Sequence, residues 1–124
     1  MRIMLMILFL VIGQGAQADL LSDSRGQWEG SGMLDSGLTW PIYVKFLANS
    51  ANVNTPDDGC EAIWTFESVT PNMIRGWEEV TVGADRCYVG LNFVVTRQDQ
   101  NRLKVDWFQM NGMFVAKAVL WRVQ

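Results

Sequence analysis

Apolar and polar residues alternate with a period of two along most of the chain after residue 18, and this pattern constrains the fold more than any other feature. Short alternating runs are separated by turn-forming residues about every ten positions, which is typical of all-β domains. The connections are short and favour antiparallel neighbours. We predict an all-β fold, an antiparallel up-and-down meander of seven to eight strands that forms a small barrel or a sandwich.

Seven of these runs are clear, and a polar connection holds a candidate for the eighth. The clear runs lie at 28–34, 40–46, 60–66, 73–82, 87–95, 103–107 and 113–123. The connection 48–59 contains the candidate strand at 52–55. Pro41 has no N–H to donate to a ladder, so it predicts an edge or a bulge in the second strand. Asn111-Gly112 predicts a type I′ hairpin before the last strand.

Residues 1–18 have the three parts of a secretory signal peptide. Arg2 supplies the positive start, residues 3–12 form an apolar core, and Ala16-Gln17-Ala18 supplies the small residues of a cleavage site. This apolar core is too short to span a bilayer, which needs about twenty residues, so no stable membrane insertion is expected after cleavage. We predict one all-β domain at residues 19–124 of an exported protein, periplasmic or secreted.

Without this leader the chain has nine basic and thirteen acidic residues. Such a balance gives no basic face for nucleic acid and no polybasic patch for an anionic membrane. The expected partner is therefore a small molecule or a protein, and we expect the chain to be a monomer.

The two cysteines of the chain, Cys60 and Cys87, are most simply one disulfide in an exported domain of this size. On the chain-entropy model such a bridge stabilises a domain by about 3–4 kcal/mol. Both cysteines begin predicted strands of the same direction with one strand between them, which in a flat sheet separates them by about 9–10 Å. That exceeds the reach of a disulfide. The bridge thus predicts either strong sheet curvature or a cysteine in a loop.

The chain contains no histidine, which removes the imidazole of Ser-His-Asp and Cys-His catalysis and of the common zinc sites. It also lacks a phosphate-binding loop, a dinucleotide fingerprint and a nucleophile elbow. We predict that it is not an enzyme, with no catalytic residue, no cofactor and no metal. Asp57-Asp58-Gly59 with Glu61 offers oxygen ligands to calcium but lacks the spacing of a known loop, so we interpret it as a solvated turn.

Both ends of the predicted domain carry residues that are typical of one superfamily. Gly26-Gln27-Trp28 is a G-x-W motif at the first strand, and Arg122 closes the last strand in phase with Leu120. In these features the chain resembles the lipocalin and avidin superfamily, the calycins. The resemblance implies eight strands, the eighth within 48–59, and an arginine that packs over the tryptophan at one barrel end. The chain is also similar to small secreted bacterial β domains with one disulfide, a resemblance that implies no activity.

Glu78 is the residue that packing explains least. It falls in register with Ile74 and Val80 on the apolar face of its strand. A buried carboxylate must be paired or have its pKa raised, and Arg122 is a candidate partner. The alternative is a bulge near Gly76 that turns Glu78 out to solvent.

Four of the six tryptophans lie on predicted inner faces: Trp28, Trp40, Trp64 and Trp107. Large side chains can simply fill a small core. Small inward residues on neighbouring strands equally allow an aromatic-lined cavity, and both interpretations stay open. Our ligand-binding hypothesis comprises Glu78, Arg122, Trp28, Trp64 and Trp107.

Two functions follow from this pattern. We predict a secreted or periplasmic small β-barrel binding protein that holds a small apolar or amphipathic ligand. The alternative is a secreted inhibitor, immunity or protein-interaction domain that acts through loops and an outer face. The aromatic residues predicted on that outer face are Tyr43, Trp77, Tyr88 and Phe108. An internal cavity favours the first function, and a filled core with exposed aromatic residues favours the second.

Overall fold

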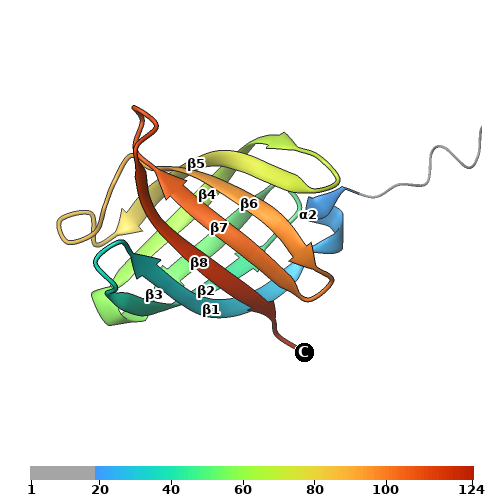
Figure 1. The fold of residues 1–124 in the computed structure, drawn as a ribbon, viewed down its shortest axis with the longest axis horizontal. Helices are drawn as coiled ribbons and strands as arrows, with labels where there is room; N and C mark the ends of the chain where they lie inside the picture. Colours follow the sequence, from blue (N-terminus) through green and yellow to red (C-terminus); the bar gives the residue numbers. More distant parts are fainter. Residues whose placement is uncertain (1–18) are drawn as a thin grey trace, which may run out of the picture.

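The computed structural model describes residues 19–124, and the predicted signal peptide, residues 1–18, lies outside the described residues. Eight strands form one closed barrel in chain order, and β1 pairs with β8 to close it (Figure 1). The strands are β1 (Gly26–Leu34), β2 (Thr39–Phe46), β3 (Ser50–Thr55), β4 (Cys60–Val69), β5 (Met73–Val82), β6 (Asn92–Asp99), β7 (Arg102–Phe108) and β8 (Phe114–Arg122). All neighbours are antiparallel, which confirms the meander, and the closing pair of β1 with β8 decides for a barrel over a sandwich.

The strand that the resemblance implies in addition to the seven clear runs is β3, and it lies within the polar connection 48–59. Its residues Ala51 and Val53 alternate into the core, which gives this strand the same period of two as the others. With an even number of strands, β1 and β8 run antiparallel, and Trp28 lies directly opposite Arg122. The G-x-W residue and the last arginine are therefore neighbours, as the resemblance implies.

The predicted strand at 87–95 is wrong in its first half. β6 begins only at Asn92, and Cys87 and Val89 lie in the connection from β5, where Val89 is exposed. The backbone N–H groups of Arg86 and Cys87 both donate to the carbonyl of Gly83, which forms a turn instead of a ladder. The disulfide therefore joins β4 to a loop, which is one of the two solutions that the strand spacing allowed.

Two local predictions have different outcomes. β2 pairs with β3 only from Tyr43 onward, so Pro41 lies at a free edge of that ladder, as predicted. The type I′ turn at Asn111-Gly112 is wrong, because such a turn needs positive φ at both central residues and only Gly112 has it. The Asn111 side chain instead accepts the backbone N–H of Met113 at 2.9 Å, within a longer loop.

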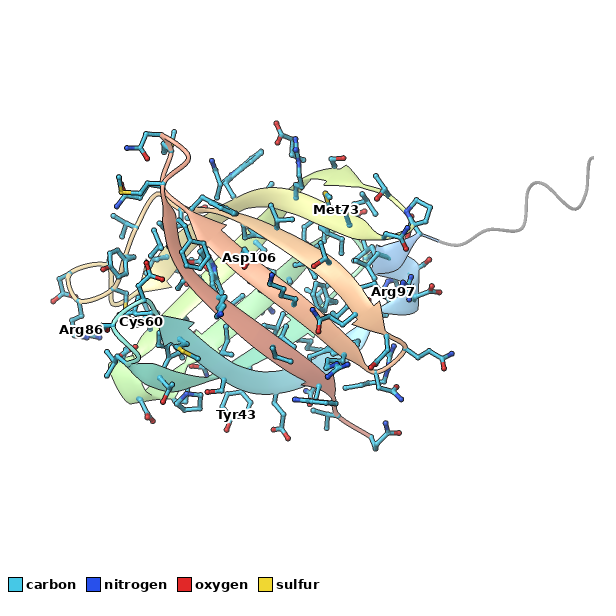
Figure 2. The ribbon with its side chains drawn as sticks, viewed as in Figure 1. Tyr43, Cys60, Met73, Arg86, Arg97 and Asp106 are labelled. Atoms are coloured by element: carbon cyan, nitrogen blue, oxygen red, sulfur yellow. A yellow bond between two sulfur atoms is a disulfide. The ribbon has the colours of Figure 1, made fainter. Side chains whose placement is uncertain are left out.

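The connections alternate between the two ends of the barrel because all neighbouring strands are antiparallel. The closed end comprises the short helix α2 (Leu20–Asp23) and the connections 47–49, 70–72 and 100–101. The open end comprises the connections 35–38, 56–59, 83–91 and 109–113, of which 56–59 contains the 3-10 turn η1 (Pro56–Asp58). Figure 2 shows Cys60 and Arg86 at the open end and Arg97 toward the closed end.

Aromatic side chains fill the middle of the barrel. The rings of Trp64 and Phe93 stack with centroids 4.3 Å apart, and Phe46 and Phe66 pack around them. Trp64, Phe46 and Phe93 are almost completely buried. Burial of such large rings contributes a major share of the core energy of a small domain. The interior is thus solid at its centre, and any ligand site must lie toward one end.

Candidate functional site

Helix α2 plugs the closed end. Leu20 and Leu21 are buried in the core, and the Leu20 N–H donates to the carbonyl of Thr70. Asp19 caps the helix by accepting the N–H of Ser22 at 2.8 Å, and this hydrogen bond lowers the pKa of Asp19. The side chains of Leu20 and Leu21, on one helical turn just before β1, therefore close this end of the barrel.

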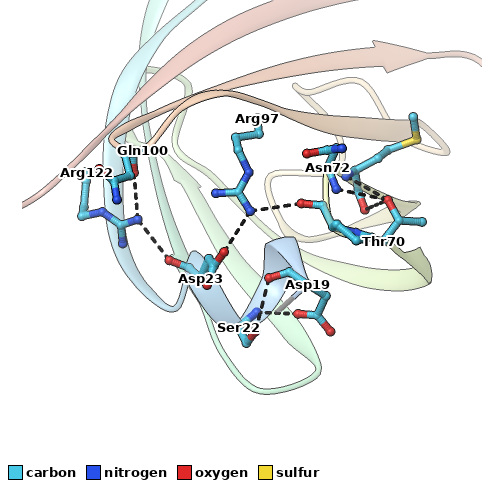
Figure 3. A network of polar contacts seen from close by, with 10 residues as sticks. Asp19, Ser22, Asp23, Thr70, Asn72, Arg97, Gln100 and Arg122 are labelled. Carbon is cyan, nitrogen blue, oxygen red and sulfur yellow. Dashed lines mark hydrogen bonds and ion pairs between the residues drawn. The ribbon is translucent and has the colours of Figure 1, made fainter. Parts of the chain in front are cut away.

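Two arginines complete this closure (Figure 3). Arg122 lies over the Trp28 ring at 4.5 Å from its centroid and donates to the carbonyls of Asp23 and Gln100 at 3.0 and 3.1 Å. Arg97 forms an ion pair with the Asp23 carboxylate at 2.9 Å. The arginine–tryptophan contact that the resemblance implies is confirmed. Each of these groups finds its partners within the chain, so the closed end is a structural seal.

The open end contains a cavity of about 240 Å³. Its walls combine apolar side chains from the strands with residues of the open-end loops. They include Leu34, Leu38, Trp40, Ile42, Val53, Ala62, Glu78, Val80, Tyr88, Leu91, Trp107, Val115 and Ala116. The position of Trp40 depends on Gly32, because a Cβ there would lie 2.4 Å from the indole ring. The expected small inward residues Ala62 and Ala116 help to leave this space open.

Glu78 lies at the inner part of this cavity and points into the barrel. Its Oε1 accepts the indole N–H of Trp64 at 2.8 Å and that of Trp107 at 3.0 Å. Within residues 19–124, no donor of the protein bonds its second oxygen, Oε2. Burial raises the pKa of Glu78, and the two indole hydrogen bonds oppose this shift. A carboxylate with one bonded and one free oxygen thus lies among mostly apolar side chains, while the other charged residues that line the cavity, Asp58, Glu61 and Arg86, belong to the open end near the disulfide.

The strand register explains why Glu78 faces inward. Glu78 lies opposite Trp64 on β4, and Gly76 lies opposite Phe66 two residues earlier on the same face. A Cβ at Gly76 would lie 1.9 Å from the backbone oxygen of Thr65, so the two strands approach too closely there for any side chain. The glycine thus accommodates the bend of the barrel, and the inward register continues through it.

The loop 83–91 is fastened across the open end. The Cys60–Cys87 disulfide joins it to β4 with a Cα–Cα distance of 6.6 Å. Arg86 adds two hydrogen bonds, from Nε to the Asp58 carbonyl at 3.2 Å and from Nη2 to the Gly59 carbonyl at 3.0 Å. The loop therefore forms one fixed wall of the cavity. A disulfide is consistent with an oxidising, exported compartment.

Comparison with known proteins shows the fold and no family. No protein-family model matches the sequence, and no curated protein does so either. A redesigned β-barrel matches with a TM-score of 0.61 and 16% identity, over 84% of this chain and 95% of that one. A de novo designed fluorescence-activating β-barrel matches with a TM-score of 0.57 and 14% identity, over 86% and 99%. The likeness supports a small eight-stranded antiparallel barrel and does not extend to the lipocalin and avidin superfamily.

The structure separates the five residues of the ligand-binding hypothesis into two groups. Glu78, Trp64 and Trp107 lie together at the open end, joined by hydrogen bonds. Arg122 and Trp28 lie at the closed end, so the predicted pairing of Glu78 with Arg122 is wrong. Glu78 points inward, which decides against the alternative of a bulge that turns it out to solvent, but Glu78 and Arg122 lie at opposite ends of the barrel.

Some cavity residues were not among the predicted site residues. Trp40 was expected inside but not as part of a site. Tyr88 was expected on an outer strand face, whereas it lies in the loop 83–91 and lines the cavity mouth. Among the other residues of the predicted outer face, Tyr43 and Trp77 are exposed, and Phe108 is half-buried against Phe114. The sequence signal that could have predicted the loop 83–91 is the pair Gly83 and Gly90, which lie near its two ends and both have positive φ.

Residues 19–124 contain no group of three acidic or cysteine side chains arranged to hold a metal ion. The carboxylates of Asp57, Asp58 and Glu61 thus do not converge in this part of the chain. No described helix is both long enough and apolar enough to cross a membrane.

Proposed function

We propose that this chain is an exported binding protein that holds one small apolar or amphipathic molecule in the open end of its barrel. The observation that carries the proposal is the cavity of about 240 Å³, in whose inner part Glu78 accepts hydrogen bonds from the protein at one carboxylate oxygen only. Pockets for small ligands are mostly apolar with a few oriented polar groups. This cavity has that composition, and the filled barrel centre limits it to one end.

The proposal includes the compartment. The sequence of residues 1–18 predicts export, and the disulfide between Cys60 and Cys87 fits an oxidising environment, periplasmic or extracellular. On this view the protein carries its ligand without chemical change, because a chain without histidine whose cavity has one inward carboxylate offers little for catalysis.

Native mass spectrometry of the oxidised protein, purified from its own host, tests the proposal. We expect a reproducible extra mass that is lost on denaturation. Val80→Phe would place a ring in the cavity and should remove that mass, whereas Val119→Phe, on the outer face of β8, should retain it. A wild-type protein without bound mass that also takes up no neutral test ligand, such as 1-octanol, would contradict the proposed function.

A second candidate is a protein-interaction domain, and exposed apolar side chains at the open end favour it. Leu38, Tyr88, Val89, Met110 and Met113 are all more than half exposed and come from three different loops. Such a cluster is a frequent feature of interaction surfaces. Met110→Ser with Met113→Ser should then abolish cross-linking to a partner in the exported compartment and leave small-molecule binding unchanged.

A further inference from the structure

We propose that the ligand of this cavity is a small amphipathic amine, whose ammonium group binds Oε2 of Glu78 while its apolar body lies against the cavity walls. This inference rests on the proposed function and specifies its ligand class. Three features of the cavity support it, namely the bonding of Glu78, the balance of charge and the aromatic lining.

The first feature is the fixed position of the carboxylate. Two indole N–H groups, from Trp64 and Trp107, both donate to Oε1 and hold the Glu78 side chain from two strands. Trp64 is almost completely buried and Trp107 nearly so. Because rigid rings position one oxygen, the other is also fixed and lacks a protein donor in residues 19–124. Oε2 is therefore free to accept a hydrogen bond from a molecule in the cavity, either water or the ammonium group of a ligand.

The second feature is the absence of a compensating cation in the described cavity wall. Arg86 is its only basic residue, and its guanidinium already donates to the carbonyls of Asp58 and Gly59 and to the Asp85 carboxylate. Asp58 and Glu61 also line the cavity, so its carboxylates outnumber its guanidinium groups. This balance attracts a cation and repels a carboxylate ligand.

The third feature is the aromatic lining. Trp40, Trp107 and Tyr88 come from two strands and one loop and line the same space. Aromatic faces attract ammonium groups and also accept an apolar chain or ring. The cavity thus favours a molecule with one ammonium group and a compact apolar body, over both a neutral lipid-like molecule and a fatty acid.

The test compares three probes of equal chain length on the oxidised wild-type protein: n-octylamine, 1-octanol and octanoate. Titration calorimetry near neutral pH measures each affinity, with octylamine protonated because its pKa is close to that of lysine, about 10. We expect octylamine to bind at least tenfold more tightly than 1-octanol, and octanoate to bind most weakly. This comparison needs no substitution and does not depend on the folding of a variant.

Glu78→Gln gives the matched variant. The amide oxygen can still accept both indole N–H groups, while the charge at the second atom is lost. Glu79→Gln removes the same charge from the exposed face of the same strand and serves as control. We expect Glu78→Gln to weaken octylamine binding at least tenfold and to leave 1-octanol binding within twofold, and Glu79→Gln to change neither.

Two results would overturn the amine assignment and leave the proposed function intact. One is equal or tighter binding of 1-octanol or octanoate by the wild-type protein. The other is equal octylamine binding by folded Glu78→Gln and Glu79→Gln. If none of the three probes binds the wild-type protein, the amine assignment is contradicted, and the proposed function is contradicted as well when native mass spectrometry shows no bound mass.

Discussion

The arginines at the closed end of the barrel and Glu78 at the open end differ in how completely the chain satisfies their hydrogen bonds. At the closed end, Arg122 and Arg97 bond to backbone carbonyls and to Asp23, and these partners come from the chain itself. At the open end, Glu78 has a protein partner at one oxygen only. Polar groups whose hydrogen bonds are all made within the chain stabilise the fold, whereas the second oxygen of Glu78 is left free to bond a molecule in the cavity. Substitutions at the closed end should therefore change stability, and those at the open end should change binding.

The largest expected effect lies at the closed end. Trp28 is buried, donates its indole N–H to the Ser24 carbonyl at 2.8 Å and lies under Arg122. Trp28→Ala should lower the free energy of unfolding by about 3–5 kcal/mol, because it leaves a large cavity. Trp121→Ala, at an exposed position on the outer face of β8, should cost about 1 kcal/mol or less. Urea denaturation measures both, and equal losses would contradict the closed end as the main structural seal.

The disulfide is an exception to this division between the two ends, because it lies at the open end and yet contributes to stability. Cys60 and Cys87 are separated by 27 residues in sequence. Replacing both with serine should lower the free energy of unfolding by about 3–4 kcal/mol on the chain-entropy model. Wild-type protein in a reducing buffer should show the same loss in the same denaturation experiment. A loss in the serine variant alone would point to disturbed packing around Cys60 and not to the bridge.

A smaller effect is expected for Arg122. Arg122→Gln removes the cation over Trp28 and the charged hydrogen bonds to Asp23 and Gln100. We expect a loss of about 2 kcal/mol in thermal or urea unfolding and no change in octylamine affinity. Arg75→Gln, at an exposed position of β5, serves as the control and should change neither quantity measurably. Weaker octylamine binding by Arg122→Gln would reinstate this arginine as part of the ligand site.

The sequence predicts which way a side chain faces better than where it lies along the barrel. The period of two placed Arg122 on the inner face and left Glu78 either inward or turned out by a bulge; in the structure Glu78 points inward and Arg122 lies over a core ring. Their depth depends on strand direction. β5 runs toward the open end and β8 toward the closed end, so Arg122, at the end of β8, lies far from Glu78. The seven clear runs already imply these opposite directions, because β3 precedes both strands; what β3 adds is the antiparallel pairing of β1 with β8 that places Trp28 opposite Arg122.

The loop 83–91 could not be predicted from alternation alone. Cys87, Val89 and Leu91 alternate with polar or small residues as a strand would, yet only Leu91 is buried and the loop precedes β6. The backbone conformation decides the outcome, because Gly83 and Gly90 both have positive φ. Tyr88 lines the cavity mouth because of this loop, so the missed loop is also the missed part of the candidate site.

The smallest expected effect is the pH dependence that Glu78 gives to stability. Burial raises the pKa of Glu78 in the folded state, so folding disfavours its charged form. The contribution of a protonated Glu78 to stability is thus complete below the ordinary glutamate pKa, about 4.3, and is lost as the pH rises through the raised folded value. The neutral amide of the Glu78→Gln variant resembles the protonated carboxyl at every pH, so this variant does not lose that contribution.

The variants Glu78→Gln and Glu79→Gln isolate this effect, since each keeps one of the two adjacent glutamates, the inward-facing Glu78 or the exposed Glu79, and all further titrating groups are common to both. We expect the stability of Glu78→Gln relative to Glu79→Gln to increase from about pH 4 to about pH 8, measured by urea denaturation at each pH. Octylamine should oppose the increase, because an ammonium group at Oε2 favours the charged carboxylate of the Glu79→Gln protein. A difference that falls with pH would mean that the indole hydrogen bonds from Trp64 and Trp107 outweigh burial, and that the ligand-free site already stabilises a negative charge.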